Sequence, residues 1–233
     1  MCLCLGLFVL VFRLVLPLLP LTPQHLATAF SSMKVEGHEI LQPLDKQQAK
    51  DVRAVMISMV LATDNKHHLK YLSEFDNKID EDECDFDNWE DQILVLQIAL
   101  HAADVANPAK PRPLYKQWTE RIMKEFYSQG DKELEQGMPV TPFLDRRKPI
   151  PEERFQSGFI KAIVQPLYQA FSRVDGLDLR VPLKTLDLNL KWCVAALCAC
   201  LVYAYACRRK QAALTPPLVC GHRRYQDIID GQQ

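Results

Sequence analysis

The stretch Asp91–Asp131, DQILVLQIALHAADVANPAKPRPLYKQWTERIMKEFYSQGD, decides how the rest of the chain is interpreted. Apolar residues recur at helical spacing along its first part, at Ile93, Leu96 and Leu100. The same stripe then ends in the carboxylate of Asp104, which needs a cation or a hydrogen-bond donor if it lies on an apolar face. Pro108 disfavours further helix, so the pattern predicts a helix over residues 91–107.

Three polar residues gather at the end of this predicted helix: His101, Asp104 and Asn107. His101 and Asp104 are three positions apart, which places them on one face of the same turn. A carboxylate beside an imidazole and an amide suits a metal ion. The same residues also fit a helix-end aspartate that pairs with a neighbouring histidine or arginine. The residues alone leave both interpretations open.

Further stretches with helical periodicity flank this one, over about residues 45–62, 66–75, 114–130 and 152–171. Asp45 is placed to cap the first of them. In the third, apolar residues repeat every fourth position, at Leu114, Trp118, Ile122 and Phe126, as they do on a core-facing stripe. The sequence contains neither an alternating strand pattern nor a glycine-rich phosphate loop. We therefore predict an all-α fold, a compact multi-helix domain.

The segments between these helices are predicted to be irregular. They are a polar connector over residues 22–44, an acidic loop over Asp76–Asp91, a short turn over 132–136 and a proline-rich loop over 138–151. The acidic loop lacks the central glycine and terminal glutamate of an EF-hand, so a solvated loop is favoured over a calcium site. Gly130 is expected to end the helix before it, and Pro166 to kink the last one.

Composition narrows the class of protein. The net charge is -1 and no basic stripe stands out, which argues against a nucleic-acid partner. The eight cysteines include no CxxC pair, which argues against a zinc ribbon or a redox motif. Only Cys84 lies in the middle of the chain, so the core needs no disulfide and a reducing compartment is expected.

Both ends of the chain carry apolar segments. Residues 1–21 form an apolar run broken by Arg13, a residue that would cost about 2.5–3.5 kcal/mol at the centre of a membrane span. Residues 193–207 form a second run, shorter than the roughly twenty residues a span needs, and basic residues 208–210 follow it. Membrane association through 1–21 or 193–207 is one hypothesis, and a buried terminal helix over 193–207 is the other.

Several motifs occur in the order and spacing of a known family. They are VLATDNKHH at 60–68, HAADVANPAK at 101–110, LYKQWTERIMKEFYSQGDKE at 114–133 and GFIKAIVQPLY at 158–168. Together they resemble the catalytic domain of class I cyclic nucleotide phosphodiesterases. The resemblance implies an all-α domain of the HD-superfamily type and metal-dependent hydrolysis of cAMP and/or cGMP to the 5'-nucleotide, in the cytoplasm. It also divides the chain into an apolar leader and connector (1–37), a partial catalytic domain (38–174) and a C-terminal extension (175–233) with the apolar helix 193–207.

The resemblance assigns roles to individual residues. Asp104 matches the family aspartate that binds the tightly held metal, with Zn²⁺ and Mg²⁺ (or Mn²⁺) expected as a pair, and His101 supports the pocket. Gln156 matches the glutamine that hydrogen-bonds the purine edge. Phe159 and Ile122 match the residues that clamp the base from either side. Asn107 and Phe126 match further substrate-pocket residues.

Other features of the family pattern have no match. The resemblance covers only the C-terminal portion of such a domain, and the six histidines do not reproduce the upstream general-acid and metal-binding motifs. No general-acid histidine is therefore assigned. Asn65 departs from the apolar residue commonly found after the LATD run, and Phe143 lies in a loop that varies between family members. The alternative hypothesis is a catalytically dead remnant that acts as a binding or regulatory module, with a membrane tether. Since the amide of Gln156 can rotate, it is compatible with either purine.

Overall fold

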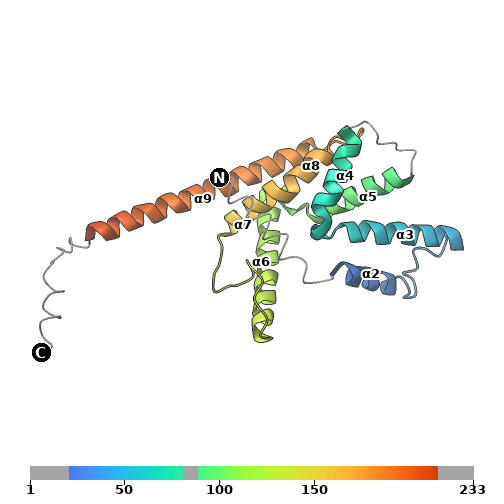
Figure 1. Ribbon diagram of the computed structural model, residues 1–233, viewed down its shortest axis with the longest axis horizontal. Helices are drawn as coiled ribbons and strands as arrows, with labels where there is room; N and C mark the ends of the chain where they lie inside the picture. Colours follow the sequence, from blue (N-terminus) through green and yellow to red (C-terminus); the bar gives the residue numbers. More distant parts are fainter. Residues whose placement is uncertain (1–20, 81–88, 215–233) are drawn as a thin grey trace, which may run out of the picture. The chain divides into compact units, whose positions relative to one another are not determined.

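The computed structural model describes residues 21–80 and 89–214, and every regular element among them is helical (Figure 1). The α-helices are α2 (Leu21–Ser32), α3 (Lys46–Ala62), α4 (His68–Asp80), α5 (Trp89–Asp104), α6 (Arg112–Glu135), α7 (Glu152–Phe159), α8 (Gln165–Phe171) and α9 (Arg180–Leu214). Shorter turns of 3-10 helix lie at η2 (Asn65–His67) and η3 (Asn107–Ala109), and a π-helical turn lies at η4 (Ile160–Val164). The all-α prediction is confirmed.

Helix α5 lies at the centre of the hydrophobic core and packs against α3, α4 and α8. Its buried apolar residues are Leu94, Ile98 and Ala102, and Val105 directly after the helix is buried as well. The predicted stripe of Ile93, Leu96 and Leu100 is therefore wrong, because Leu96 is 38% exposed and the other two are only half-buried. The helix is apolar on more than one side, so periodicity alone could not select the face that its neighbours cover.

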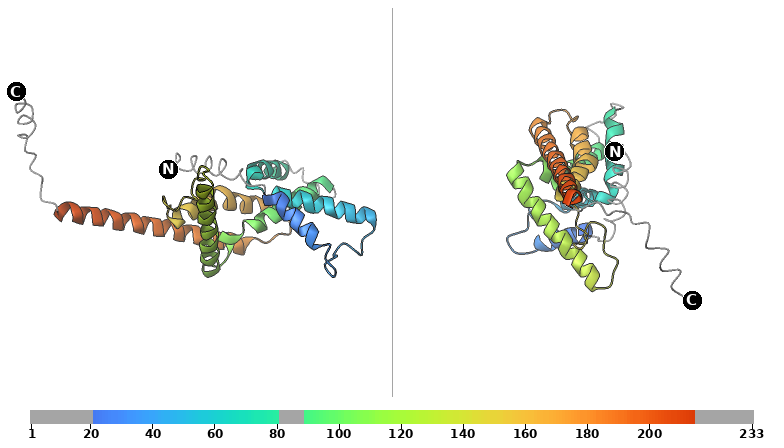
Figure 2. Two further views of the ribbon diagram at one scale, coloured as in Figure 1. Left: turned by 90° about the horizontal axis from the view of Figure 1, so that it is seen from below. Right: turned by 90° about the vertical axis from the view of Figure 1, so that its left-hand side faces the viewer.

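Helix α3 begins as the sequence predicts. The Asp45 side chain accepts hydrogen bonds from the backbone of Gln47 and Gln48, and the Gln48 side chain accepts one from the Asp45 backbone, which completes a capping box. The amide of Gln97 joins α5 to α3 by donating to Ser58 Oγ at 2.7 Å. Helix α2 lies alongside α3 within the stretch that was predicted to be an irregular connector (Figure 2).

Helix α4 extends to Asp80, and α5 begins at Trp89, so the predicted acidic loop is wrong at both of its ends. Residues 81–88 lie outside the described residues. The carboxylates of Asp76 and Asp80 pair with the guanidinium of Arg173, which neutralises charge that would otherwise favour a solvated loop.

Helix α6 continues to Glu135, so the predicted end at Gly130 and the separate turn after it are both wrong. Tyr115, Thr119 and Met123 form the buried face of α6. Leu114 and Trp118 of the predicted core stripe are 47% and 50% exposed. The observed buried face therefore lies one residue after the predicted stripe. The prediction followed purely apolar side chains, whereas the buried face includes a tyrosine and a threonine.

The predicted kink at Pro166 takes the form of a wider turn. The five residues of η4 separate α7 from α8, and Pro166 occupies the first turn of α8. Proline has no backbone N–H and clashes with the preceding turn, and a π-helical turn accommodates both effects. Ile160 and Val164 of this turn are fully buried, so the irregular segment forms part of the core.

Helix α9 closes the core with Leu186, Asn189 and Cys193, which are all buried. Two compact units divide the chain after Val194, inside this helix, and the described part of the second unit is helical up to Leu214. No helix within the described ranges has the length and apolar character that crossing a bilayer requires. The apolar leader 1–20 and the tail 215–233 lie outside those ranges.

Candidate functional site

The turn between α5 and α6 is held by two asparagines. Asn107 Nδ2 donates to the backbone oxygen of Tyr115 and to Thr119 Oγ1, both at 3.3 Å. Asn189 of α9 donates to the backbone oxygens of Pro108 at 2.8 Å and Lys110 at 2.9 Å. Because Asn189 is 1% exposed, these bonds form in a region of low dielectric constant. The turn that follows Asp104 is thus fixed to both α6 and α9.

Asp104 ends α5 with its side chain exposed. The surrounding protein removes enough solvent to raise the pKa of this carboxyl, and the charge of His25 acts in the opposite direction. No group of three or more His, Cys, Asp or Glu side chains that could hold a metal ion occurs among the described residues. One carboxylate is too few ligands for a zinc or magnesium ion, so the described residues do not by themselves fit the expected metal pair.

Asp104 is exposed, whereas the ring of His101 lies in the core. Its Nε2 lies 2.9 Å from Nδ1 of His68 on α4, and both residues are 1% exposed. Burial lowers the pKa of His101 to about 4, and burial together with the neighbouring His101 lowers the pKa of His68 to about 4. Both rings are therefore neutral near pH 7, and they join α4 to the end of α5.

Gln156 on α7 is 4% exposed and is oriented by Tyr115 on α6. The Tyr115 hydroxyl donates to Gln156 Oε1 at 3.1 Å and lies 3.4 Å from Cys193 Sγ on α9. Burial raises the pKa of both Tyr115 and Cys193, so each keeps its proton at neutral pH. With Oε1 turned toward Tyr115, the Nε2 group of Gln156 is the donor left for a further partner.

Aromatic rings surround the start of α7. The ring of Phe155 lies 6.0 Å from Phe126 and 5.9 Å from Phe143 between centroids, each pair edge to face. Phe159 is half-buried against the core, and Ile122 is half-buried one turn beyond Thr119.

The structure thus links two of the predicted site residues, Asn107 and Gln156, through the buried Tyr115. It brings Phe126 to Phe155, beside Gln156 in the sequence. Sequence analysis did not single out Tyr115 or Cys193. The repeat of Tyr115, Thr119 and Met123 at every fourth position was the available signal for a second face of α6.

Residues 19–186 match the sequence profile described as 3'5'-cyclic nucleotide phosphodiesterase. The chain belongs to this family. Among curated relatives, "3',5'-cyclic-AMP phosphodiesterase 4C" of Rattus norvegicus is 39% identical over 174 residues, which cover 72% of this chain and 32% of that relative. "Probable 3',5'-cyclic-AMP phosphodiesterase pde-4" of Caenorhabditis elegans is 36% identical over 178 residues, 74% of this chain and 26% of that relative.

A solved structure described as LmjPDEB1 in complex with IBMX has the same fold as this phosphodiesterase family member. The TM-score is 0.71 at 26% identity, and the match covers 76% of this chain and 53% of that chain. The family resemblance predicted from the sequence is therefore confirmed, and the family is metal-dependent in general. The chain spans about a third or less of the curated relatives' length.

Proposed function

We propose that the chain forms the purine-binding part of a 3',5'-cyclic nucleotide phosphodiesterase, and that cAMP is its substrate. The reaction would hydrolyse the cyclic phosphodiester to the 5'-nucleotide. The hydrogen bond from Tyr115 to Gln156 Oε1 carries the proposal, because it orients a buried amide beside aromatic rings. The names of the relatives support cAMP, since both are cyclic-AMP phosphodiesterases.

The chemistry of the amide favours adenine. A glutamine side chain can donate from Nε2 to a ring nitrogen of adenine while its oxygen accepts from the exocyclic amino group. The oxygen has two lone pairs, so the bond from Tyr115 leaves one for the base. Guanine has a carbonyl oxygen where adenine has the amino group, and two oxygens would then face each other. Ile122 and Phe159 are proposed to hold the flat faces of the base.

Asp104 is the one residue that the proposal assigns to the metal ions. A divalent metal pair, Zn²⁺ with Mg²⁺ or Mn²⁺, would supply a nucleophile and neutralise the phosphate. Asp104 is proposed as one ligand. Since the described residues do not complete a metal site, we derive no step of hydrolysis through it. The same observation favours the second candidate function, a module that binds the nucleotide without turnover.

The domain boundaries and the cellular location also belong to the proposal. Residues 38–174 form the partial catalytic domain, with 1–37 and 175–233 as flanking segments. The location is cytoplasmic, which is supported by the thiols of Cys193 and Cys198 being free among the described cysteines.

The test uses the purified 233-residue chain. Isothermal titration measures binding of cAMP and of cGMP, and a turnover assay with zinc and magnesium present measures hydrolysis. Asp104→Ala is compared with Asp51→Ala, which removes an exposed carboxylate of α3. We expect cAMP to bind more tightly than cGMP. Turnover lost only in Asp104→Ala would support the hydrolase, whereas binding with no turnover would support the binding module. A folded chain that binds neither nucleotide would refute both.

A further inference from the structure

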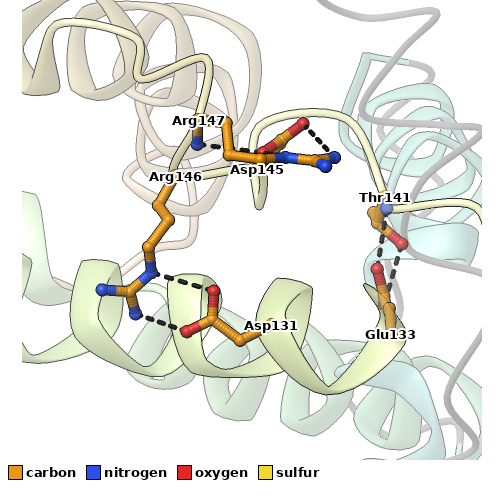
Figure 3. A network of polar contacts seen from close by, with 6 residues as sticks. All are labelled: Asp131, Glu133, Thr141, Asp145, Arg146 and Arg147. Carbon is orange, nitrogen blue, oxygen red and sulfur yellow. Dashed lines mark hydrogen bonds and ion pairs between the residues drawn. The ribbon is translucent and has the colours of Figure 1, made fainter. Parts of the chain in front are cut away.

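The loop between α6 and α7, residues 136–151, is fixed to α6 at three places. Figure 3 shows those made by Glu133 with Thr141 and by Asp131 with Arg146. The first is the carboxylate of Glu133, which accepts from the Thr141 backbone N–H at 2.7 Å and from the Thr141 hydroxyl at 2.9 Å. Gln129 donates to the same carboxylate at 2.8 Å. Both Glu133 and Thr141 are buried, so these charge-assisted bonds are shielded from solvent.

The second attachment is a close approach of two backbones. A Cβ atom built on Gly130 would lie 2.1 Å from the backbone oxygen of Leu144, a separation that no side chain can adopt. Glycine is therefore required at this position of α6 because the loop passes directly over it.

The third attachment is an ion pair. Arg146 donates from Nε to Asp131 Oδ1 at 2.9 Å, and a second guanidinium nitrogen lies 2.7 Å from Oδ2. Next to it, Arg147 folds back on Asp145, so the segment after Leu144 is also ordered locally (Figure 3). The loop is thereby held at residues 141, 144 and 146.

Phe143 lies between these points in a strained conformation. Its φ is 71°, and among the described residues it is the one non-glycine residue with positive φ. This region is unfavourable for a bulky side chain and persists only where the surroundings impose it. The attachments at Thr141 and Leu144 on either side supply that constraint.

The strain directs the ring of Phe143 toward α7. Its centroid lies 5.9 Å from that of Phe155, and the ring of Phe126 lies 6.0 Å from Phe155. Phe155 is 6% exposed and directly precedes Gln156. A change in the position of the Phe155 ring would therefore move the adjacent backbone of α7, which carries the Gln156 amide.

We propose that Phe143 is a positioning residue, which acts through Phe155 to fix the Gln156 amide and so sets how tightly the purine is bound. This deepens the proposed function and rests on it for the identity of the ligand. Three attachments to α6 fix the loop around the strained backbone of Phe143, and the edge-to-face ring contact joins Phe143 to α7.

The variants separate the effect of the Phe143 side chain from the effect of its strained backbone. Phe143→Ala removes the ring and keeps a residue that disfavours positive φ, whereas Phe143→Gly removes the ring and relieves the strain. Gly130→Ala leaves Phe143 intact but forces the loop away from α6. Phe143→Leu keeps an apolar side chain and guards against loss of folding. Phe171→Ala, which shortens a half-buried aromatic of the core, is the matched control.

Two measurements are made on the full chain. The side-chain amide resonances of Gln156, identified by their loss in Gln156→Glu, report its environment without nucleotide, and titration gives the cAMP and cGMP dissociation constants. We expect Phe143→Ala, Phe143→Gly and Gly130→Ala each to shift those resonances and to weaken cAMP binding by roughly tenfold, the upper end for an aromatic contact. Phe143→Gly should unfold at higher urea than Phe143→Ala, yet bind no better.

The inference is overturned if Phe143→Ala and Phe143→Leu leave the Gln156 resonances unmoved and merely lower stability as Phe171→Ala does. If the wild-type chain binds neither nucleotide, the proposed function fails while the resonances still decide whether Phe143 positions Gln156.

Discussion

Acid should destabilise the chain through the buried imidazole pair of His68 and His101. The two rings share one hydrogen bond of 2.9 Å in the core, and burial lowers the pKa of each to about 4 from 6.5. A histidine whose pKa is lower in the folded state binds its proton more tightly after unfolding. The pair therefore adds no pH dependence to the stability above about pH 6.5, and it reduces stability as the pH falls from there toward 4.

The size of the effect follows from the two pKa values. Each pH unit between the usual pKa of 6.5 and the folded value of about 4 corresponds to about 1.4 kcal/mol per histidine. Each ring therefore lowers the free energy of unfolding by about 3 kcal/mol at pH 4. A domain of this size has a typical margin of about 5–15 kcal/mol. Protonation of the pair would thus remove a large share of that margin.

The assay is urea denaturation of the full chain at several pH values between 7.5 and 4.5. The control is His68→Leu with His101→Leu, which replaces both partners by apolar residues and leaves no buried nitrogen unpaired. Carboxylates titrate equally in both proteins, so the difference between their pH slopes isolates the pair. Both histidines bind their protons more tightly in the unfolded state, so we expect the wild type to lose about 4 kcal/mol more than the double variant between pH 6.5 and 4.5. Equal slopes would refute the reasoning, as would a proton NMR titration in which all six histidines titrate near pH 6.5.

Three other substitutions have definite expected outcomes. Tyr115→Phe removes the donor to Gln156 Oε1 and should weaken cAMP binding by about fivefold or more, with a smaller preference over cGMP, measured by titration. Asn189→Ala breaks two buried bonds to the turn after Asp104 and should lower the free energy of unfolding by about 2–4 kcal/mol in urea, whereas Asp187→Ala, on the same helix, should change it by less than about 1. Asp45→Ala should cost about 1 kcal/mol by removing the capping box of α3, and no loss of stability would contradict that account.

The sequence predicted the helices better than their buried faces. Asp45 marked the start of α3 correctly because a helix cap acts within a few residues of itself. The end of α5 predicted at Asn107 is wrong, because α5 ends at Asp104 and Pro108 lies in the 3-10 turn η3. The faces of α5 and α6 were misassigned because both helices carry apolar residues on more than one side. Which side is buried depends on neighbours such as α8 and α9, and those contacts join residues far apart in the chain.

The helix end predicted at Gly130 and the loop predicted from clustered carboxylates were wrong for a related reason. Gly130 looked like a helix end, yet it lies inside α6 because Leu144 crosses its surface. Asp76 and Asp80 looked like part of a solvated loop, yet they pair with Arg173 more than ninety positions away. In both cases a tertiary contact overrode the local preference, and the local sequence pattern does not indicate that contact.

The contacts that orient the candidate site also join residues far apart in the sequence. Tyr115 is 41 positions from Gln156 and 78 from Cys193, and Asn189 is 81 from Pro108. Closing such separations costs chain entropy that only the assembled core repays, so these bonds form after the helices have packed. The Gln156 amide is therefore oriented only when α6, α7 and α9 are all in place. The ability to bind a base with a defined polarity is consequently a property of the assembled core rather than of any single motif, which is why the motif at Gln156 alone left both purines open.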